Sequence, residues 1–349
     1  MSMQKASNIS TTAPPVRAVV DLIDYETSRV AFLLVVPLGF VVQLLGAVTN
    51  GINVVVFFKV GLKDVVSVSF FALSLSDLFF TIISSILTEG NIILYIIYYR
   101  TLWSRDVKLL GDFVIWYSVI FKDSTLLFTT YIAIARCCLV TFPLQFKTTF
   151  TLRRTYYALS GIFIGNLFLH LPILFTQGLM WAFDLKTNTT RLVLWETPDV
   201  KTTLAFHDLV NRNVIPYVCY SVIFICLIVL YSKLVSATKF RQRLRNDAAK
   251  TSSKLSPRDV RVVKAVFFVS LFYLVCFVPV AVLAFFHFLF PEFSYGKLYN
   301  NTYNFVFALS TFISPLNSTF NIAFYLKYNT KFRETVMKCR FCYTTKIKK

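Results

Sequence analysis

The stretch Val30–Phe58, VAFLLVVPLGFVVQLLGAVTNGINVVVFF, contains no Asp, Glu, Lys, Arg or His. It is longer than the roughly 20 residues that a helix needs to cross the hydrocarbon core of a bilayer. It is too long for a strand of a membrane barrel and lacks the two-residue alternation of such a strand. We therefore predict that this stretch is a membrane-spanning helix.

Further apolar stretches follow along the whole chain. Hydrophobic residues make up 56% of the sequence and charged residues 15%, whereas a soluble domain carries roughly 25% charged residues. The sequence therefore predicts an all-α membrane protein with a bundle of seven transmembrane helices. The other expected spans run approximately over Val65–Ile97, Leu109–Val140, Thr155–Trp181, Leu209–Val235, Val260–Phe290 and Tyr299–Leu326.

The net charge of +19 suits nucleic-acid binding by its size alone, but its distribution indicates membrane topology instead. If the end after Leu326 is cytoplasmic, the inner segments hold 24 of the 36 Lys and Arg residues. An excess of Lys and Arg on the cytoplasmic side orients membrane proteins. We therefore expect a multi-pass plasma-membrane protein without a nucleic-acid partner. Its expected parts are an extracellular tail (1–29), a seven-helix domain (30–328), and a cytoplasmic amphipathic helix with a basic tail (329–349).

Two modification patterns agree with this orientation. The glycosylation pattern Asn-x-Ser/Thr occurs on the predicted outer side at Asn8, Asn188 and Asn300. Cys339 and Cys342 follow an amphipathic basic stretch, so they are either palmitoylation sites or plain thiols. No predicted outer loop contains a cysteine, which excludes an extracellular disulfide framework.

Polar residues inside the spans are costly in hydrocarbon, so they mark the places where function should be sought. The first span contains Asn50, and the second contains Asp77 in L-S-L-S-D-L. The third ends A-R-C-C-L-V-T-F-P-L with Arg136, and the sixth contains C-F-V-P with Pro279. The seventh contains N-S-T-F-N-I-A-F-Y, with Asn317, Ser318, Asn321 and Tyr325.

In this order and in these spans, the residues resemble the rhodopsin-like (class A) G-protein-coupled receptors from Val30 to Phe341. The runs K-x-G-x-K-D, P-L-Q-F-K-T-T-F-T-x-R-R-T and S-P-R-D-V-R-V-V-K in the inner loops are similar to chemosensory receptors of gastropod molluscs. The resemblance implies a receptor, not an enzyme, that binds an extracellular small molecule or peptide and activates a heterotrimeric G protein. A chemosensory role and a neuropeptide (FMRFamide-like) receptor are the two alternatives that it suggests.

The sequence departs from the family pattern at several positions. Ala135 replaces the acidic residue before the arginine, Ile322 replaces the proline after Asn321, and Phe277 replaces the tryptophan before Pro279. Gly111 stands in place of the cysteine at the outer end of the third span. This last departure leaves open how the outer loop from Ala182 to His207 is held over the pocket.

The resemblance implies a sodium site beside the carboxylate of Asp77. The matching residues all bear oxygen, as a hard cation requires, and Asn50 lies in the same polar network. The alternative is a water-filled hydrogen-bond network around a protonated Asp77. The residues of the expected site are Asp77, Thr125, Asn317, Ser318 and Asn321.

The resemblance also implies an activation switch at the inner ends of the spans. Arg136 is expected to pair with Asp259 in the resting state, since Ala135 offers no acid. The sixth span would swing out about its kink at Pro279 during activation, with Phe277 as the aromatic toggle, and Tyr325 and Tyr231 would turn inward. Alternatively, Arg136 is only a positive charge that anchors the inner end of the third span. Separately, the basic loop Lys239–Lys264 is expected to contact the G protein or acidic membrane lipids.

Lys122 is the unusual residue of the expected ligand pocket. It lies fourteen residues before Arg136, about 21 Å along a helix at 1.5 Å per residue. Ser118 lies on the same face of this helix. Three readings remain open: internal pairing with Glu89 or another carboxylate, recognition of an anionic ligand, or a deprotonated lysine. Ser118 replaces the aspartate of amine receptors and Pro315 replaces the lysine of opsins, which argues against both classes.

A transporter or ion-conducting protein is the alternative from another class, with Asp77, Lys122 and Asp123 as a relay. The absence of inverted repeats and the motif around Arg136 favour the receptor. No catalytic constellation is evident, and His170, His207 and His287 are scattered in the sequence. We expect no cofactor other than a possible sodium ion.

Overall fold

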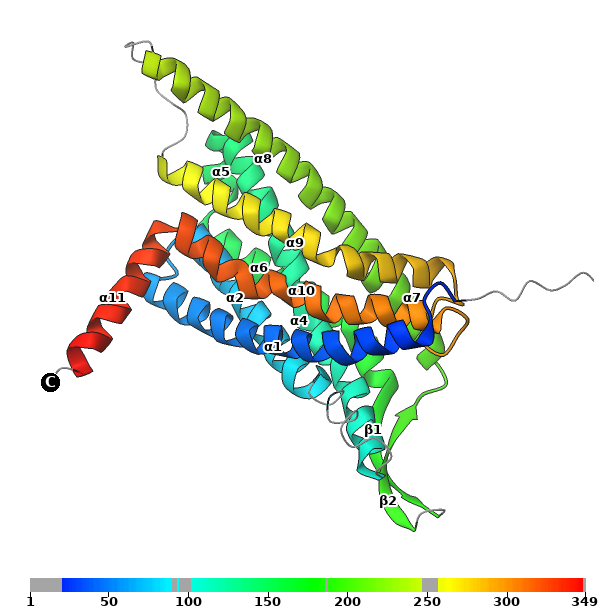
Figure 1. Cartoon of the computed structure of the whole chain (residues 1–349). Helices are drawn as coiled ribbons and strands as arrows, with labels where there is room; N and C mark the ends of the chain where they lie inside the picture. The colour runs from blue at the N-terminus through cyan, green and yellow to red at the C-terminus, as the bar shows by residue number, and fades with distance from the viewer. Residues whose placement is uncertain (1–20, 90–92, 94–101, 186–187, 247–256, 348–349) are drawn as a thin grey trace, which may run out of the picture.

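The computed structural model describes residues 21–89, 93, 102–185, 188–246 and 257–347. Some side chains within these ranges are not described, those of Glu89, Asp259, Cys339 and Cys342 among them, and Asn8 lies outside the ranges. Long helices lie side by side as a bundle (Figure 1). They are α1 (Tyr25–Val60), α2 (Val65–Ile83), α4 (Leu102–Thr141), α6 (Leu152–Thr176), α8 (Ile215–Asn246), α9 (Pro257–Leu289) and α10 (Asn300–Tyr328).

Helical segments of this bundle have the length and hydropathy of membrane spans. Six ranges among the described residues meet both requirements, and α10 is the more polar seventh helix, packed along α1 and α9. The seven-helix bundle predicted from the sequence is therefore confirmed. The six ranges are Tyr25–Val60, Val65–Ile86, Leu109–Thr141, Leu152–Thr176, Val200–Ser236 and Val263–Leu289.

Capping side chains begin several of these helices. Asp24 accepts a hydrogen bond from the Thr27 N–H (2.8 Å) at the start of α1. Asp64 does the same for the Ser67 N–H (2.9 Å) at the start of α2. Such caps satisfy amide groups that have no partner within the first helical turn. At the other end of α1, Gly61 has φ +90°, a conformation that L side chains rarely adopt, and the chain turns there.

The spans differ from the sequence prediction at their outer ends. α1 begins at Tyr25, so the end of the expected tail is helical. The α-helical part of α2 ends at Ile83 and continues as a π-helical turn, Ser84–Glu89. α6 ends at Thr176, and Trp181, expected at the end of the fourth span, lies in a β-strand. The apolar run continues past the helix because this strand is also rich in apolar residues.

A β-hairpin forms the second outer loop and lies beside the outer end of α4 (Figure 1). Strand β1 (Gln177–Asp184) pairs antiparallel with β2 (Thr189–Glu196), and Ala182 lies opposite Arg191. The buried Arg191 reaches α4, where its Nε lies 3.4 Å from Oδ1 of Asp106. An ion pair therefore joins the hairpin to α4 at the end of the helix where the sequence lacks the cysteine of the family.

Two short helices complete the inner side. α5 (Pro143–Thr149) follows α4, and α11 (Thr330–Ile347) turns away from the bundle after α10 (Figure 1). Lys331 of α11 binds Oδ2 of Asp64 at 3.0 Å. Burial opposes ionisation of Asp64, but its hydrogen bonds from Ser67 and Lys331 outweigh burial and lower the pKa of this carboxyl. A helix thus follows α10 in the segment where the sequence predicts one, and its first turn is fixed to the bundle.

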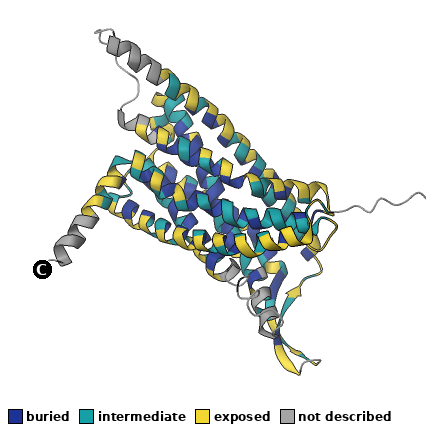
Figure 2. Cartoon of the chain, in the orientation of Figure 1, coloured by how far each residue is buried: buried dark blue, intermediate teal, exposed yellow. Residues whose placement is uncertain are grey.

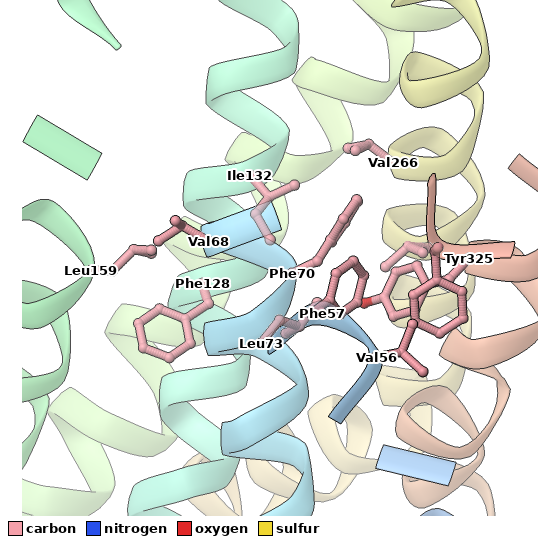
Figure 3. Packing of buried hydrophobic residues seen from close by; sticks show 12 residues of the cluster. Val56, Phe57, Val68, Phe70, Leu73, Phe128, Ile132, Leu159, Val266 and Tyr325 are labelled. Atoms are coloured by element: carbon pink, nitrogen blue, oxygen red, sulfur yellow. The ribbon is translucent and has the colours of Figure 1, made fainter. Parts of the chain in front are cut away.

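Figure 2 shows buried residues toward the middle of the bundle and exposed residues on its outside. One core cluster joins α1, α2, α4, α6, α9, α10 and α11 at the inner side (Figure 3). The ring of Tyr325 packs against Phe57 and Phe70, with centroids 5.1 Å and 4.8 Å away, and against Phe332 of α11 at 5.6 Å. These contacts place Tyr325 in the core and dock α11 through Phe332.

Glycine allows α1 and α10 to approach closely. A Cβ atom added to Gly39 would lie 2.8 Å from the backbone oxygen of Thr311. Small residues at helix interfaces let backbones come together in membranes, where packing drives association. Gly39 therefore fixes the distance between the first and the last helix of the bundle.

The start of α10 is capped by a residue from the other end of the chain. The Asp21 carboxylate accepts hydrogen bonds from the N–H groups of Asn301 (2.6 Å) and Thr302 (3.3 Å) and from the Thr302 hydroxyl. Burial opposes ionisation of Asp21, but these hydrogen bonds outweigh it and lower the pKa of its carboxyl. The segment before α1 is thereby held at the outer end of α10.

We predict that Asp21→Ala lowers receptor stability by about 1 kcal/mol, the usual cost of losing a helix cap. Because the folded pKa lies below the unfolded value, the carboxylate stabilises the wild type above the unfolded pKa. That contribution is lost as the pH falls through the folded pKa. Thermal unfolding of purified receptor, followed as the pH is lowered below about 4, should show the two proteins converge. A constant difference between them would contradict this role of Asp21.

Candidate functional site

A cavity of about 370 Å³ lies among α4, α8, α9 and α10. This volume is at the lower end of the range of ligand sites, roughly 300–1,000 Å³. Three residues predicted from the sequence line it: Ser118, Lys122 and Phe277. Ser118 is buried, and its hydroxyl donates to the Ile115 carbonyl oxygen (2.8 Å). The side chain of Glu89, the fourth expected pocket residue, lies outside the described part of the chain.

The ammonium group of Lys122 lies over an aromatic ring. Its Nζ is 5.8 Å from the centroid of Phe277, a weak cation–π distance. Among the side chains that the structure describes, no carboxylate lies within ion-pair distance of Lys122. The neighbouring Asp123 also lines the cavity, but its Oδ2 lies 3.3 Å from Nε2 of His170 on α6. Asp123 is thus engaged by a residue other than Lys122.

His170 is fully buried, and its ring forms a hydrogen bond through Nδ1 only, among the described residues. Nδ1 lies 2.9 Å from the carbonyl oxygen of Asn166, which can only accept, so Nδ1 carries a proton. Nε2 faces the Asp123 carboxylate. A proton on Nε2 as well makes an ion pair of His170 and Asp123, which fixes Asp123 toward α6.

The histidines that are scattered in the sequence lie together in the structure. The His207 ring contacts the edge or face of both His170 and Trp116, with each centroid 5.1 Å away. His207 belongs to α7 (Val200–Leu209), which continues through the π-helical turn Val210–Val214 into α8. His170 and His207, which are far apart in the sequence, meet because α6 and α7 pack against each other.

The Asp77 carboxylate is fully buried and accepts two side-chain hydrogen bonds. Thr125 Oγ1 donates to Oδ1 (2.8 Å), and Asn321 Nδ2 donates to Oδ2 (2.9 Å). Asn50 donates to the backbone oxygen of Ser318 (3.1 Å), which joins α1 to α10. The structure thus brings Asp77, Thr125 and Asn321 into one network, as the sequence predicts.

Other expected members of this network have different orientations. The Ser318 hydroxyl donates to the Pro315 oxygen (3.0 Å) and does not contact the Asp77 carboxylate. The amide oxygens of Asn317 and Asn321 are buried without a hydrogen-bond partner among the described residues, as is the Ser74 hydroxyl. Unpaired buried oxygens beside a carboxylate fit a hard cation or water. The residues present therefore fit a sodium ion, which stays a prediction.

The expected switch residues lie at different levels of the bundle, and Phe277 is at the level of the cavity. Arg136 is buried near the end of α4, and Asp259 lies in α9 with an undescribed side chain, so their pairing stays a prediction. Tyr231 of α8 is 61% exposed, in contrast to the buried Tyr325. Pro279 lies inside α9, and Phe277 stacks on Tyr273 with centroids 4.3 Å apart.

The modification sites are described only in part. Asn188 is exposed at the tip of the hairpin, with φ 52°, and is open to a glycan. Asn300 begins α10, and its Oδ1 accepts a hydrogen bond from the Gly296 N–H (2.8 Å). Asn8 and the side chains of Cys339 and Cys342 lie outside the description. Glycosylation and palmitoylation stay predictions.

The sequence analysis did not predict the polar side of the cavity, which is formed by residues of α7 and of the π-helical turn that follows it. His207 was assigned to a loop, and Asn211 was not considered although it interrupts an apolar run. Both are buried and line the cavity. The usable signal was the one applied to the other spans, a polar residue within an apolar helix.

The comparison with known families agrees with this arrangement. No curated protein sequence matches the chain. The sequence model described as "7 transmembrane receptor (rhodopsin family)" matches residues 50–325, from the Asn50 network to the buried Tyr325. Signalling through a heterotrimeric G protein from the plasma membrane, with the amino terminus outside, follows from this family. The chain belongs to the rhodopsin family of seven-transmembrane receptors and is not an enzyme.

Proposed function

We propose that the extracellular ligand of this receptor is a small molecule with an anionic group, and that Lys122 binds that group. The observation that carries the proposal is the position of Lys122 in the cavity, where Asp123 is engaged by His170. A cation within the membrane is costly unless an opposite charge compensates for it. An anionic ligand supplies that charge when it binds.

The surroundings of Lys122 determine the rest of the ligand. Aromatic side chains line the cavity around it, so the body of the ligand is apolar or aromatic. A volume of about 370 Å³ suits a small molecule better than a peptide of several residues. The aromatic lining is made by Trp116, Tyr217, Tyr220, Tyr273, Phe277, Tyr303 and Phe307.

A chemosensory role is part of this proposal. It is supported by the likeness of the inner loops to gastropod chemosensory receptors and by a cavity suited to small molecules. A neuropeptide receptor is the competing function, in which only one end of a peptide would enter the cavity. The two functions differ in ligand size, which a screen of small carboxylates and short peptides distinguishes.

Inside the cell, we propose that Arg136 contacts the G protein when α9 moves outward about Pro279. The burial of Arg136 near the inner end of α4 supports this role. The Asp77 network lies between the cavity and Arg136 along α4, through Thr125, and would hold a sodium ion. Such an ion would supply the positive charge that the buried carboxylate lacks.

The test of the ligand class is Lys122→Met in a cell assay of G-protein activation. The agonists are small aromatic carboxylates, each paired with its uncharged methyl ester. We expect the variant to respond to a carboxylate only at roughly 10- to 100-fold higher concentration, because a hydrogen bond to a charged group contributes about 1.5–3 kcal/mol. The response to the ester should change little.

Lys297→Met serves as the matched control, since Lys297 is exposed in the outer loop before α10. It should leave both responses unchanged. If every active carboxylate is equally potent on the wild type and on Lys122→Met, Lys122 does not bind the anionic group of the ligand. If Lys122→Met fails to fold and neutralising Glu89 restores folding, the lysine is a structural partner of Glu89 instead.

A further inference from the structure

We infer that His207 and Asn211 form a second polar subsite of the cavity, which takes a neutral amide group of the same ligand. This inference rests on the proposed function and extends it. Lys122 would bind one end of the ligand, and the wall made by α7 and the turn Val210–Val214 would bind a group elsewhere on it. The ligand class is therefore an acylated amino acid or a similar amide that carries a carboxylate.

Burial and missing partners point to a ligand at this wall. His207 is 2% exposed and Asn211 is 4% exposed, and both line the cavity. Both ring nitrogens of His207 lack a hydrogen-bond partner among the described residues, as do both side-chain atoms of Asn211. Buried polar atoms are costly when unpaired, so water or a ligand must satisfy them.

The local backbone explains why these two side chains share one wall. Asn211 follows His207 by four residues, a spacing that places both on one face of a helix. Asn211 lies in the π-helical turn, a type of distortion that frequently occurs at functional sites. The neighbouring polar side chains are used within the protein, since Arg212 binds Asp208 Oδ1 (3.0 Å) and Asn213 binds the Asp208 carbonyl oxygen (2.7 Å).

The chemistry of the two side chains favours a neutral ligand group that both donates and accepts hydrogen bonds. A neutral histidine offers one donor and one acceptor, and the asparagine amide offers both as well. An ammonium group would need a carboxylate. Asp123 is engaged by His170 and Asp208 by Arg212, so the carboxylates described around this wall are occupied. An amide meets the requirement without a charge.

The experiment measures binding of two matched probes to purified receptor in lipid nanodiscs. N-acetylphenylalanine carries a carboxylate and an amide, whereas 3-phenylpropanoate carries the same ring and carboxylate without the amide. We expect the wild type to bind the acetylated probe about tenfold more tightly. His207→Phe, which keeps a ring beside Trp116, and Asn211→Leu should each remove most of that difference and leave the affinity for 3-phenylpropanoate unchanged.

Lys122→Met separates this inference from the proposed function, because it should lower the affinity of the receptor for both probes by the same factor. Equal affinity of the probes for the wild type would overturn the amide subsite while leaving the anion site intact. No effect of Lys122→Met, or no binding of either probe, would overturn the anion site and the ligand class with it.

A second measurement needs no ligand. If the polar atoms of His207 and Asn211 serve a ligand, their replacement by apolar groups of similar shape should not destabilise the empty receptor. The melting temperatures of His207→Phe and Asn211→Leu should equal or exceed that of the wild type. A clear decrease in both would show that these atoms are satisfied inside the protein, which overturns the subsite.

Discussion

Replacement of Arg136 by alanine is expected to abolish agonist-driven guanine-nucleotide exchange on the G protein, while the receptor still reaches the plasma membrane. Arg136 is buried near the inner end of α4 and is part of the A-R-C-C-L-V-T-F-P-L run. If this side chain contacts the G protein in the active state, its loss removes a contact that no neighbouring residue supplies. The measurement is nucleotide exchange in membranes with equal amounts of surface receptor.

Two companion variants test the same switch. Arg153→Ala removes an exposed inner arginine that binds the Tyr157 hydroxyl, and it should leave exchange unchanged. Asp259→Ala removes the expected resting partner of Arg136 and should raise exchange without agonist, by a coupling on the order of 1–3 kcal/mol. Normal exchange by Arg136→Ala would rule out Arg136 as the coupling residue, whatever Asp259→Ala does.

Gly39→Leu is expected to cause the largest loss of folded receptor. The Cβ alone would approach the Thr311 backbone oxygen to 2.8 Å, and backbone cannot move aside as a flexible side chain can. The larger side chain must therefore separate α1 from α10, and overpacking typically costs about 1–3 kcal/mol or more. Surface expression and the melting temperature of solubilised receptor should both decrease. Gly39→Ala should show a smaller decrease of the same kind.

Gly161→Leu is the matched control, because an added Cβ at Gly161 on α6 meets nothing within 4 Å. It should be tolerated, since the residue is exposed on the outer surface of the bundle. If Gly39→Leu is as stable as Gly161→Leu, the close approach of α1 and α10 is not required for the fold.

The bundle was predictable because a bilayer places a simple demand on sequence. Each span must be apolar over its whole length, and the few polar residues that interrupt it mark the interior. That is why Asp77, Thr125 and Asn321 were expected to meet, and they do. The hairpin was missed because an apolar strand directly after an apolar helix leaves no break in hydropathy at Thr176.

The cavity was predictable on its α4 side and at Phe277 of α9. Ser118 and Lys122 lie at fixed helical spacings from Arg136, which the sequence gives directly. The partner of Asp123 could not be obtained this way, because His170 is on another helix and no spacing relates the two. The side of the cavity that His207 lines was not predicted, because the sequence analysis placed His207 in a loop and not in a helix.

The ion pair between Arg191 and Asp106 determines how the outer hairpin responds to its chemical surroundings. A disulfide would hold this loop permanently under oxidising conditions and release it in the presence of thiols. The ion pair does not depend on redox potential, and because both side chains are largely buried, dissolved salt screens it only weakly. The hairpin of this receptor is therefore joined to α4 by a contact that neither an oxidising nor a reducing medium would change.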